Sequence, residues 1–203
     1  MGEGAPDVAK YTLMNLFFDT ETTGVPKNYK APVSDLNNWP RLVQLAWLLT
    51  DDKGQEINHG EHIVKPNGFT IPAEAAKIHG ISTELAMQEG VDLKFAVDAI
   101  VADMQKAKVL IAHNVQFDEK ILGAELLRIG YQNHLDSKPR KCTMQSSTNY
   151  CKLPGPYGFK WPKLQELHQK LFSETFDGAH RALTDVRACA RCYFELVRLG
   201  VLN

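Results

Sequence analysis

The chain has 203 residues, of which 44% are apolar and 23% charged, and its formal net charge is −1. This composition fits one globular domain with a sizeable core. No apolar run approaches the roughly 20 residues that a membrane span needs, and the N-terminus lacks the charged and then apolar pattern of a secretory signal. We therefore expect a cytoplasmic protein with no membrane association.

Residues 1–10 are small and polar, and we expect them to form a flexible N-terminal tail outside a single domain over residues 11–203. The four cysteines do not form a zinc pattern, because the pair Cys189 and Cys192 falls within a predicted helix without a second pair. Buried, reduced thiols of a cytosolic protein are the expected state.

Three strands are predicted in the first part of the chain. The apolar run over residues 13–19 ends in an acid and predicts a buried central strand. Turn-forming residues over 27–40 predict a long loop. Residues 42–51 predict a second strand, and residues 55–66 a third that pairs with it as a hairpin.

Strands and helices alternate in the rest of the chain. Asn114 is expected to cap a helix that ends at Gly130. The predicted elements are helices over 72–78, 93–107, 114–129, 163–172 and 180–199, short strands over 109–112 and 141–144, and a loop over 151–160. This order predicts one α/β domain with a mixed sheet.

Two carboxylates lie at the end of the first predicted strand, in the sequence DTETTG over residues 19–24. Residues two apart on a strand point to the same face, so Asp19 and Glu21 are neighbours. Neighbouring carboxylates raise each other's pKa unless a cation lies between them, and oxygen ligands suit Mg²⁺ or Mn²⁺. The alternative is a solvated strand end. The buried run before the acids and the turn-permitting Gly24 favour a site.

A second acid, Asp118, lies in HNVQFD over residues 113–118, where a predicted strand leads into a helix. A carboxylate in the first helical turn complements the helix dipole, and that alone explains the acid about as well as a catalytic role does. Phe117 is expected in the core, and His113 is expected to be structural.

A third segment, HRALTD over residues 180–185, opens the last predicted helix. If His180 sits at or before the first turn, His180 and Asp185 can reach one cleft. A neutral imidazole can take a proton from a metal-bound water, and a carboxylate can complete the coordination of the metal. In isolation, a surface histidine and an unrelated acid explain this spacing better.

In this order, DTETTG, HNVQFD and HRALTD resemble the three motifs of the DEDDh (DnaQ-like) 3′→5′ exonucleases, with motifs most similar to the proofreading epsilon subunit of bacterial DNA polymerase III. The resemblance covers about residues 13–199. It implies a ribonuclease H-like fold with a central five-stranded mixed sheet flanked by helices. It also implies hydrolysis that releases nucleoside 5′-monophosphates from the 3′ end of DNA, from single strands or frayed ends.

The same resemblance implies two divalent cations, Mg²⁺ or Mn²⁺, and assigns the catalytic residues. Asp19 would bridge both ions, Glu21 and Asp185 would hold the ion that activates water, Asp118 would anchor the second ion, and His180 would accept the water's proton. A further segment, KIHGIS over residues 77–82, resembles the family's segment beside the terminal nucleotide. The residues implied as substrate contacts are Thr22, Thr23, Ile78, His79, Asn114 and Phe117, although His79 also fits a plain loop histidine.

The charges are divided unevenly, with 8 basic and 14 acidic residues over 1–100 and 15 and 10 over 101–203. A basic half that meets phosphates suits a nuclease, and ordinary surface scatter explains the division as well. The rival functions are an RNA 3′ exonuclease of the ribonuclease T or oligoribonuclease type, a non-catalytic nucleic-acid binding module, and, most remote, an unrelated metal hydrolase.

Two departures from the epsilon pattern bear on partners. The loop over 25–40 is longer than expected and lies next to the predicted site, so it bears on substrate preference. The chain ends at Asn203, where the epsilon subunit continues into a polymerase-binding tail, which favours a free-standing exonuclease or a fragment. A homodimer is compatible with the resemblance, because several relatives form one.

Overall fold

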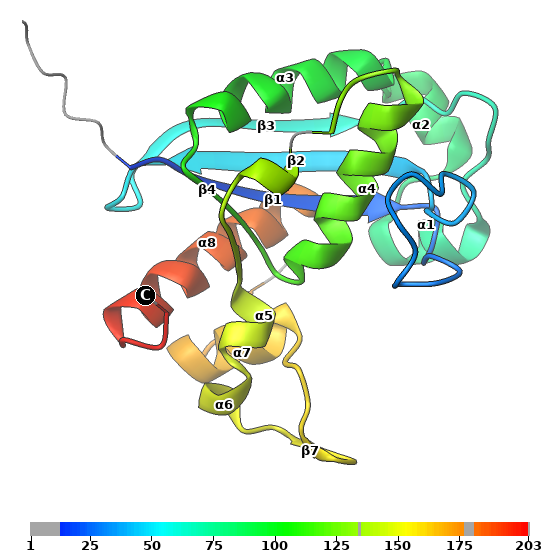
Figure 1. Cartoon of the computed structure of the whole chain (residues 1–203). Helices are drawn as coiled ribbons and strands as arrows, with labels where there is room; N and C mark the ends of the chain where they lie inside the picture. Colours follow the sequence, from blue (N-terminus) through cyan, green and yellow to red (C-terminus); the bar gives the residue numbers. More distant parts are fainter. Residues whose placement is uncertain (1–12, 134, 177–180, 203) are drawn as a thin grey trace, which may run out of the picture.

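The computed structural model describes residues 13–133, 135–176 and 181–202 (Figure 1). Its centre is a five-stranded sheet in the order β3-β2-β1-β4-β5. The strands are β1 (Asn15–Thr22), β2 (Leu42–Thr50), β3 (Glu56–Ile63), β4 (Val109–Ala112) and β5 (Arg140–Cys142). β1 is antiparallel to β2 and parallel to β4, which confirms the predicted mixed sheet.

The central strands are apolar because both of their faces are covered. Phe17 and Phe18 are adjacent on β1 and point to opposite faces, each into its own core. β2 is buried along its whole length, whereas β3 is an edge strand with a mostly exposed polar sequence. β2 and β3 pair antiparallel, so the predicted hairpin is confirmed.

Helices cover the two faces of the sheet, as Figure 1 shows, with α3 and α4 on one side and α7 and α8 on the other. The helices are α1 (Ala73–His79), α2 (Thr83–Glu89), α3 (Leu93–Lys106), α4 (Val115–Arg128), α5 (Thr143–Ser146), α6 (Thr148–Cys151), α7 (Leu164–Phe172) and α8 (Ala182–Arg198), with a 3₁₀ turn at Leu135–Ser137. Within the described residues, no helix combines the length and apolar character that crossing a bilayer requires.

Several elements differ from the sequence-based expectation. The first strand continues three residues beyond Asp19, so both of its acids lie inside the strand. α2 was not predicted; its first turn is capped by Ser82, whose hydroxyl accepts a hydrogen bond from the Leu85 N–H (3.2 Å). The strand predicted over 141–144 ends at Cys142, and the chain turns there into α5.

The segment predicted as a loop over 151–160 contains a small hairpin. β6 (Pro154–Gly155) pairs antiparallel with β7 (Gly158–Phe159). The hairpin projects from the body of the molecule below α5 and α6 in the view of Figure 1. Glycine and proline identify the turn in the sequence, but strands of two residues are too short to produce a hydrophobic period.

Asn114 precedes the first residue of α4, as predicted, but its side chain makes no capping hydrogen bond. Its backbone is left-handed (φ 87°), a conformation that asparagine tolerates better than most residues. The residue therefore turns the chain from β4 into α4 rather than capping the helix. All four cysteines are buried and free, as expected from their spacing.

Candidate active site

Three carboxylates converge beside the central strand. Asp19 and Glu21 come from β1, and Asp185 comes from the first turn of α8, and one carboxylate oxygen of each lies within 4.8 Å of the others. The extended backbone places the two β1 acids on one face, and packing of α8 against β1 and β2 brings the third acid to them. The structure thus joins the first and third sequence motifs.

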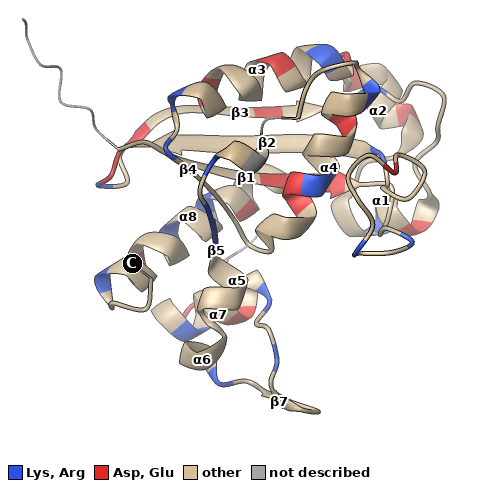
Figure 2. Ribbon diagram, viewed as in Figure 1, with Lys and Arg blue, Asp and Glu red and all other residues tan. Residues whose placement is uncertain are grey.

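Asp118 connects the second motif to the same strand. Its carboxylate is 3% exposed, and Oδ1 accepts hydrogen bonds from the Thr20 N–H (3.0 Å) and the Thr20 hydroxyl (2.8 Å). Thr20 lies between Asp19 and Glu21 in the sequence, so the same three-residue segment supplies two acids and positions a third. Figure 2 shows the acidic positions of β1 beside those at the start of α4.

Burial makes ionisation of these groups costly. It is the largest cause that raises the pKa of Asp19 well above its ordinary value, followed by the charges of Asp118, Glu21 and Asp185. Burial, and then Asp185 and Asp118, raise the pKa of Glu21 to about 7. Burial also raises the pKa of Asp118 to about 7, against the lowering effect of the Thr20 hydrogen bonds.

A divalent cation would offset this cost, because it favours the ionised form of every carboxylate near it. The donor set consists of carboxylate oxygens, which suit hard ions such as Mg²⁺ and Mn²⁺. Opposite oxygens around Mg²⁺ are about 4 Å apart, close to the spacing of Asp19, Glu21 and Asp185. The residues present therefore fit a divalent metal.

His180, the predicted proton acceptor, lies outside the described residues. The chain is described again from Arg181, which directly precedes α8. The Ala182 N–H points to the Gln44 Oε1 (3.5 Å) and the Leu183 N–H to the Glu61 Oε1 (3.4 Å), so β2 and β3 hold the start of the helix that carries Asp185.

The predicted contacts to the 3′ end, Thr22 and Thr23, lie at the end of β1. The Thr22 hydroxyl donates to the Gly24 carbonyl (2.6 Å), and the Thr23 hydroxyl accepts from the Arg41 N–H (2.9 Å). Gly24 has φ 147°, which confirms that this turn uses the freedom of glycine. Both hydroxyls thus take part in the turn beside the acids.

The other predicted substrate contacts divide into exposed and buried side chains. Ile78 is exposed near the end of α1, whereas His79 is buried and its Nδ1 accepts from the Ile81 N–H (3.2 Å). Phe117 is half-buried and packs against the core, as its sequence context predicts. His113 is also structural, as expected: Nδ1 lies 2.9 Å from the Thr143 hydroxyl and Nε2 2.9 Å from the Pro162 carbonyl.

A cleft of about 530 Å³ opens next to the acids, and the sequence motifs do not contain most of its walls. The lining residues are Asp19, His113, Met144, Trp161, Pro162, Lys163, Leu164, Gln165 and Asp185. The segment before α7 supplies one wall. In the sequence, the turn-forming residues around Trp161 obscure its alternation with the neighbouring lysines.

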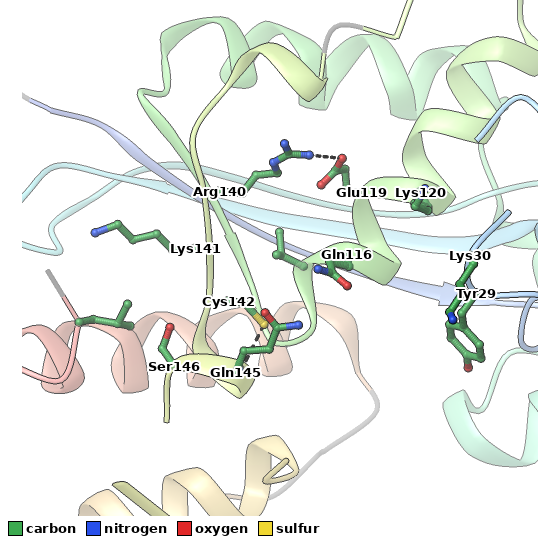
Figure 3. Close-up of a pocket in the computed structure, with 12 residues that line it drawn as sticks. Tyr29, Lys30, Gln116, Glu119, Lys120, Arg140, Lys141, Cys142, Gln145 and Ser146 are labelled. Carbon is green, nitrogen blue, oxygen red and sulfur yellow. Dashed lines mark hydrogen bonds and ion pairs between the residues drawn. The ribbon is translucent and has the colours of Figure 1, made fainter. Parts of the chain in front are cut away.

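A second, larger groove of about 900 Å³ lies between α4, β5 and α5 (Figure 3). Its basic side chains include Lys120 and Arg140. The Arg140 guanidinium is paired with Glu119, as a dashed line between them marks in Figure 3, and the Lys120 ammonium lies over the Trp39 ring, 5.5 Å from its centre. Gln116 and Glu119 of α4 face this groove, whereas Asp118 faces Thr20, so the groove and the acids lie on different sides of the helix.

Residues 16–193 match the model of the RNase T family, described as exonucleases. The matched span contains Asp19, Glu21, Asp118 and Asp185. The chain belongs to this exonuclease family. Its mixed sheet is therefore that of a DnaQ-like exonuclease, the family that the three motifs resemble in the sequence.

Relatives and solved structures agree with this assignment. The exonuclease chain is 28% identical over 179 residues to the uncharacterized exonuclease CP81 of Escherichia phage 186, covering 85% of this chain and 82% of that protein. It is 29% identical over 183 residues to the DNA polymerase III subunit epsilon of Treponema pallidum (strain Nichols), covering 89% and 74%.

Two solved structures show the same fold. E. coli exonuclease I in complex with a dA16 oligonucleotide matches with a TM-score of 0.72 at 21% identity, over 92% of this chain. A product-bound exonuclease I matches with a TM-score of 0.73 at 18% identity, over 94% of this chain. This chain spans 41% and 45% of those two proteins. The likeness confirms the predicted ribonuclease H-like fold.

Proposed function

We propose that this chain is a divalent-metal-dependent 3′→5′ exonuclease that releases nucleoside 5′-monophosphates from single-stranded or frayed 3′ ends of DNA. The observation that carries the proposal is the convergence of Asp19, Glu21 and Asp185 within 4.8 Å of one another, with Asp118 bonded to the strand between the first two. In a member of an exonuclease family, four acids around one strand support phosphodiester hydrolysis.

Two Mg²⁺ or Mn²⁺ ions, when bound, would polarise the phosphodiester and lower the pKa of a water nucleophile. Asp19, Glu21, Asp185 and Asp118 would bind these ions. The Thr20 hydrogen bonds keep the Asp118 carboxylate in one orientation, which reduces the reorganisation that binding requires.

His180 is proposed to accept the proton of the attacking water. The proposal rests on its place in the sequence, directly before the residue that precedes α8 and five residues before Asp185. An imidazole with a pKa near 6.5 is suited to accept a proton at neutral pH.

The terminal nucleoside is proposed to lie against Ile78, whose exposed side chain is available for an apolar contact. His79, Thr22 and Thr23 would then contribute to binding of the nucleoside through the turns that they stabilise. Asn114 and Phe117 would contribute through the start of α4. DNA is proposed because one relative is named as a DNA polymerase subunit and the fold neighbour was solved with a deoxyadenylate oligonucleotide.

The test uses a 5′-labelled strand, offered as DNA and as RNA of the same sequence, with Mg²⁺, Mn²⁺ or EDTA. The expected result is a ladder that shortens from the 3′ end with either metal and no product with EDTA. If RNA is shortened faster than DNA, RNA is the preferred substrate. Hydrolysis that persists in EDTA, or release of the 5′ label as a mononucleotide in the first turnovers, would refute the proposal.

A further inference from the structure

We propose that Trp161 and the β6–β7 hairpin form a stacking platform for unpaired bases on the 5′ side of the scissile phosphodiester. The inference rests on the proposed function, because it assigns the part of the substrate strand that the acids do not contact. It also names the substrate class as single-stranded, since only unpaired bases offer their faces to a protein ring.

The platform is defined by three exposed aromatic side chains within five residues. Tyr157 is fully exposed, Phe159 is 50% exposed and Trp161 is 60% exposed. The other two tryptophans, Trp39 and Trp47, are buried. Several exposed aromatic residues in one short segment mark an interaction surface more often than chance exposure does.

Trp161 lies beside the catalytic acids. It lines the 530 Å³ cleft together with Asp19 and Asp185. A strand whose terminal phosphodiester reaches those carboxylates therefore has its neighbouring nucleotides within reach of the indole ring. The cleft volume lies in the range of ordinary ligand pockets, about 300–1,000 Å³.

Hydrogen bonds on both sides of Trp161 hold its backbone in place. The Pro162 carbonyl lies 2.9 Å from His113 Nε2. Glu166 binds the Lys160 ammonium through Oε1 (2.5 Å) and the Lys163 N–H through Oε2 (2.8 Å). A platform positioned before binding loses little entropy when a base stacks on it.

The charge of the segment suits a phosphate backbone. Lys152 and Lys163 lie beside the hairpin, no acidic residue occurs between 152 and 165, and the Lys160 ammonium, at the end of the hairpin, is paired with Glu166. In Figure 2 the charged positions of this stretch are all basic. Basic residues that alternate with stackable aromatic rings are the usual design of surfaces that bind single strands without sequence preference.

The groove of Figure 3 is the competing path for the strand. Its Arg140 is paired with Glu119, and its Lys141 ammonium lies over the Tyr193 ring, 5.9 Å from the centre. The described residues that line the groove include no tryptophan and none of the four acids. The hairpin is therefore the better candidate, and Lys141 provides a matched control.

The first experiment compares Trp161→Ala, Trp161→Phe and Lys141→Ala in the full chain with Mg²⁺. The substrates are a 5′-labelled deoxythymidylate 12-mer and the p-nitrophenyl ester of thymidine 5′-monophosphate, which has no upstream bases. Trp161→Ala should raise KM for the 12-mer about tenfold, the loss expected for one stacked base, and should affect hydrolysis of the ester, which has no upstream base to stack, much less. Trp161→Phe should restore most of the affinity, and Lys141→Ala should have no effect.

The second experiment measures binding without relying on catalysis. Trp161 is the one exposed tryptophan of the three in the chain, so the part of the emission change that is lost in Trp161→Phe reports stacking on its ring. With Ca²⁺ in place of Mg²⁺ and the strand checked to be intact, the 12-mer should quench the emission of the unaltered protein. Trp161→Phe should lose the quenching yet bind a fluorescein-labelled 12-mer with similar anisotropy.

Binding without quenching, or a loss of affinity in Lys141→Ala with none in Trp161→Ala, would overturn the platform. A duplex 12-mer that quenches as strongly as the single strand would overturn its preference for unpaired bases. Failure of the proposed function looks different: neither the 12-mer nor the ester is hydrolysed, while quenching still decides whether the hairpin binds single strands.

Discussion

Replacing Asp118 with asparagine should stabilise the metal-free protein while it abolishes hydrolysis. The carboxylate is buried, and burial raises its pKa from the ordinary 3.8 to about 7. A pKa difference of one between the folded and unfolded states corresponds to about 1.4 kcal/mol. At pH 8 the ionised Asp118 therefore lowers the free energy of unfolding by about 4 kcal/mol. Asparagine keeps an oxygen that can accept from Thr20, and it carries no charge.

The net gain is smaller than the full electrostatic cost, because the asparagine amide must itself be desolvated. We expect Asp118→Asn to raise the free energy of unfolding at pH 8 in EDTA by about 1–3 kcal/mol. For a chain of this size, such a gain raises Tm by about 2–12 °C.

The pH dependence gives the decisive control. Because the pKa in the folded state lies above that in the unfolded state, the metal-free protein loses stability as pH rises from about 4 to about 7. At pH 4.5, Asp118 is already protonated in the folded protein, so the electrostatic cost of the carboxylate falls by about 3 kcal/mol and the advantage of asparagine should disappear.

Thermal unfolding followed by circular dichroism at both pH values measures this difference. Asp52→Asn, at an exposed position in the turn between β2 and β3, is the matched control and should leave Tm unchanged at both. An asparagine variant that is less stable than the parent at pH 8, or equally stabilised at both pH values, would refute the reasoning.

Three further outcomes are expected. An excess of Mn²⁺ should raise Tm of the unaltered protein at pH 8, because a hundredfold excess over Kd adds about 2.7 kcal/mol to the free energy of unfolding. Asp19→Asn should lose most of this rise in Tm. An equal rise in both proteins would mean that the ion binds elsewhere. His180→Ala should lose activity but keep the Mn²⁺-induced rise, and the parent rate should climb between about pH 6 and 8; full activity in the variant would remove His180 as proton acceptor. Thr20→Val deletes the hydroxyl that donates to Asp118 (2.8 Å) and should lower the free energy of unfolding in urea by about 1–2 kcal/mol, with no change if the backbone N–H alone holds the carboxylate.

Much of the fold follows from local patterns in the sequence. The run before Asp19 and the run over 42–51 are apolar without alternation, because both faces of a central strand are buried. The four long helices have periodic apolar faces. Features of this kind depend on about 15 consecutive residues, and they can therefore be predicted from the sequence alone.

Other elements depend on their surroundings. Nothing in residues 154–159 has a period, and the hairpin forms because Lys160 N–H bonds to the Leu153 carbonyl (2.9 Å) and Glu166 anchors the segment that follows. The sequence at Asn114 favours a helix cap. However, the chain turns sharply from β4 into α4, so Asn114 adopts a left-handed backbone and its side chain makes no capping hydrogen bond.

The sequence alone determined which acids belong together, through the order of the three motifs. Only the tertiary structure decided how they meet. The strand order β2-β1-β4 places the start of α4 beside β1, so that Asp118 bonds Thr20 across 98 residues of chain, and packing of α8 on the sheet brings in Asp185. The same packing places Trp161 in the cleft of the acids. Contacts between distant segments depend on how the layers are stacked, and that information is not contained in any short stretch of sequence.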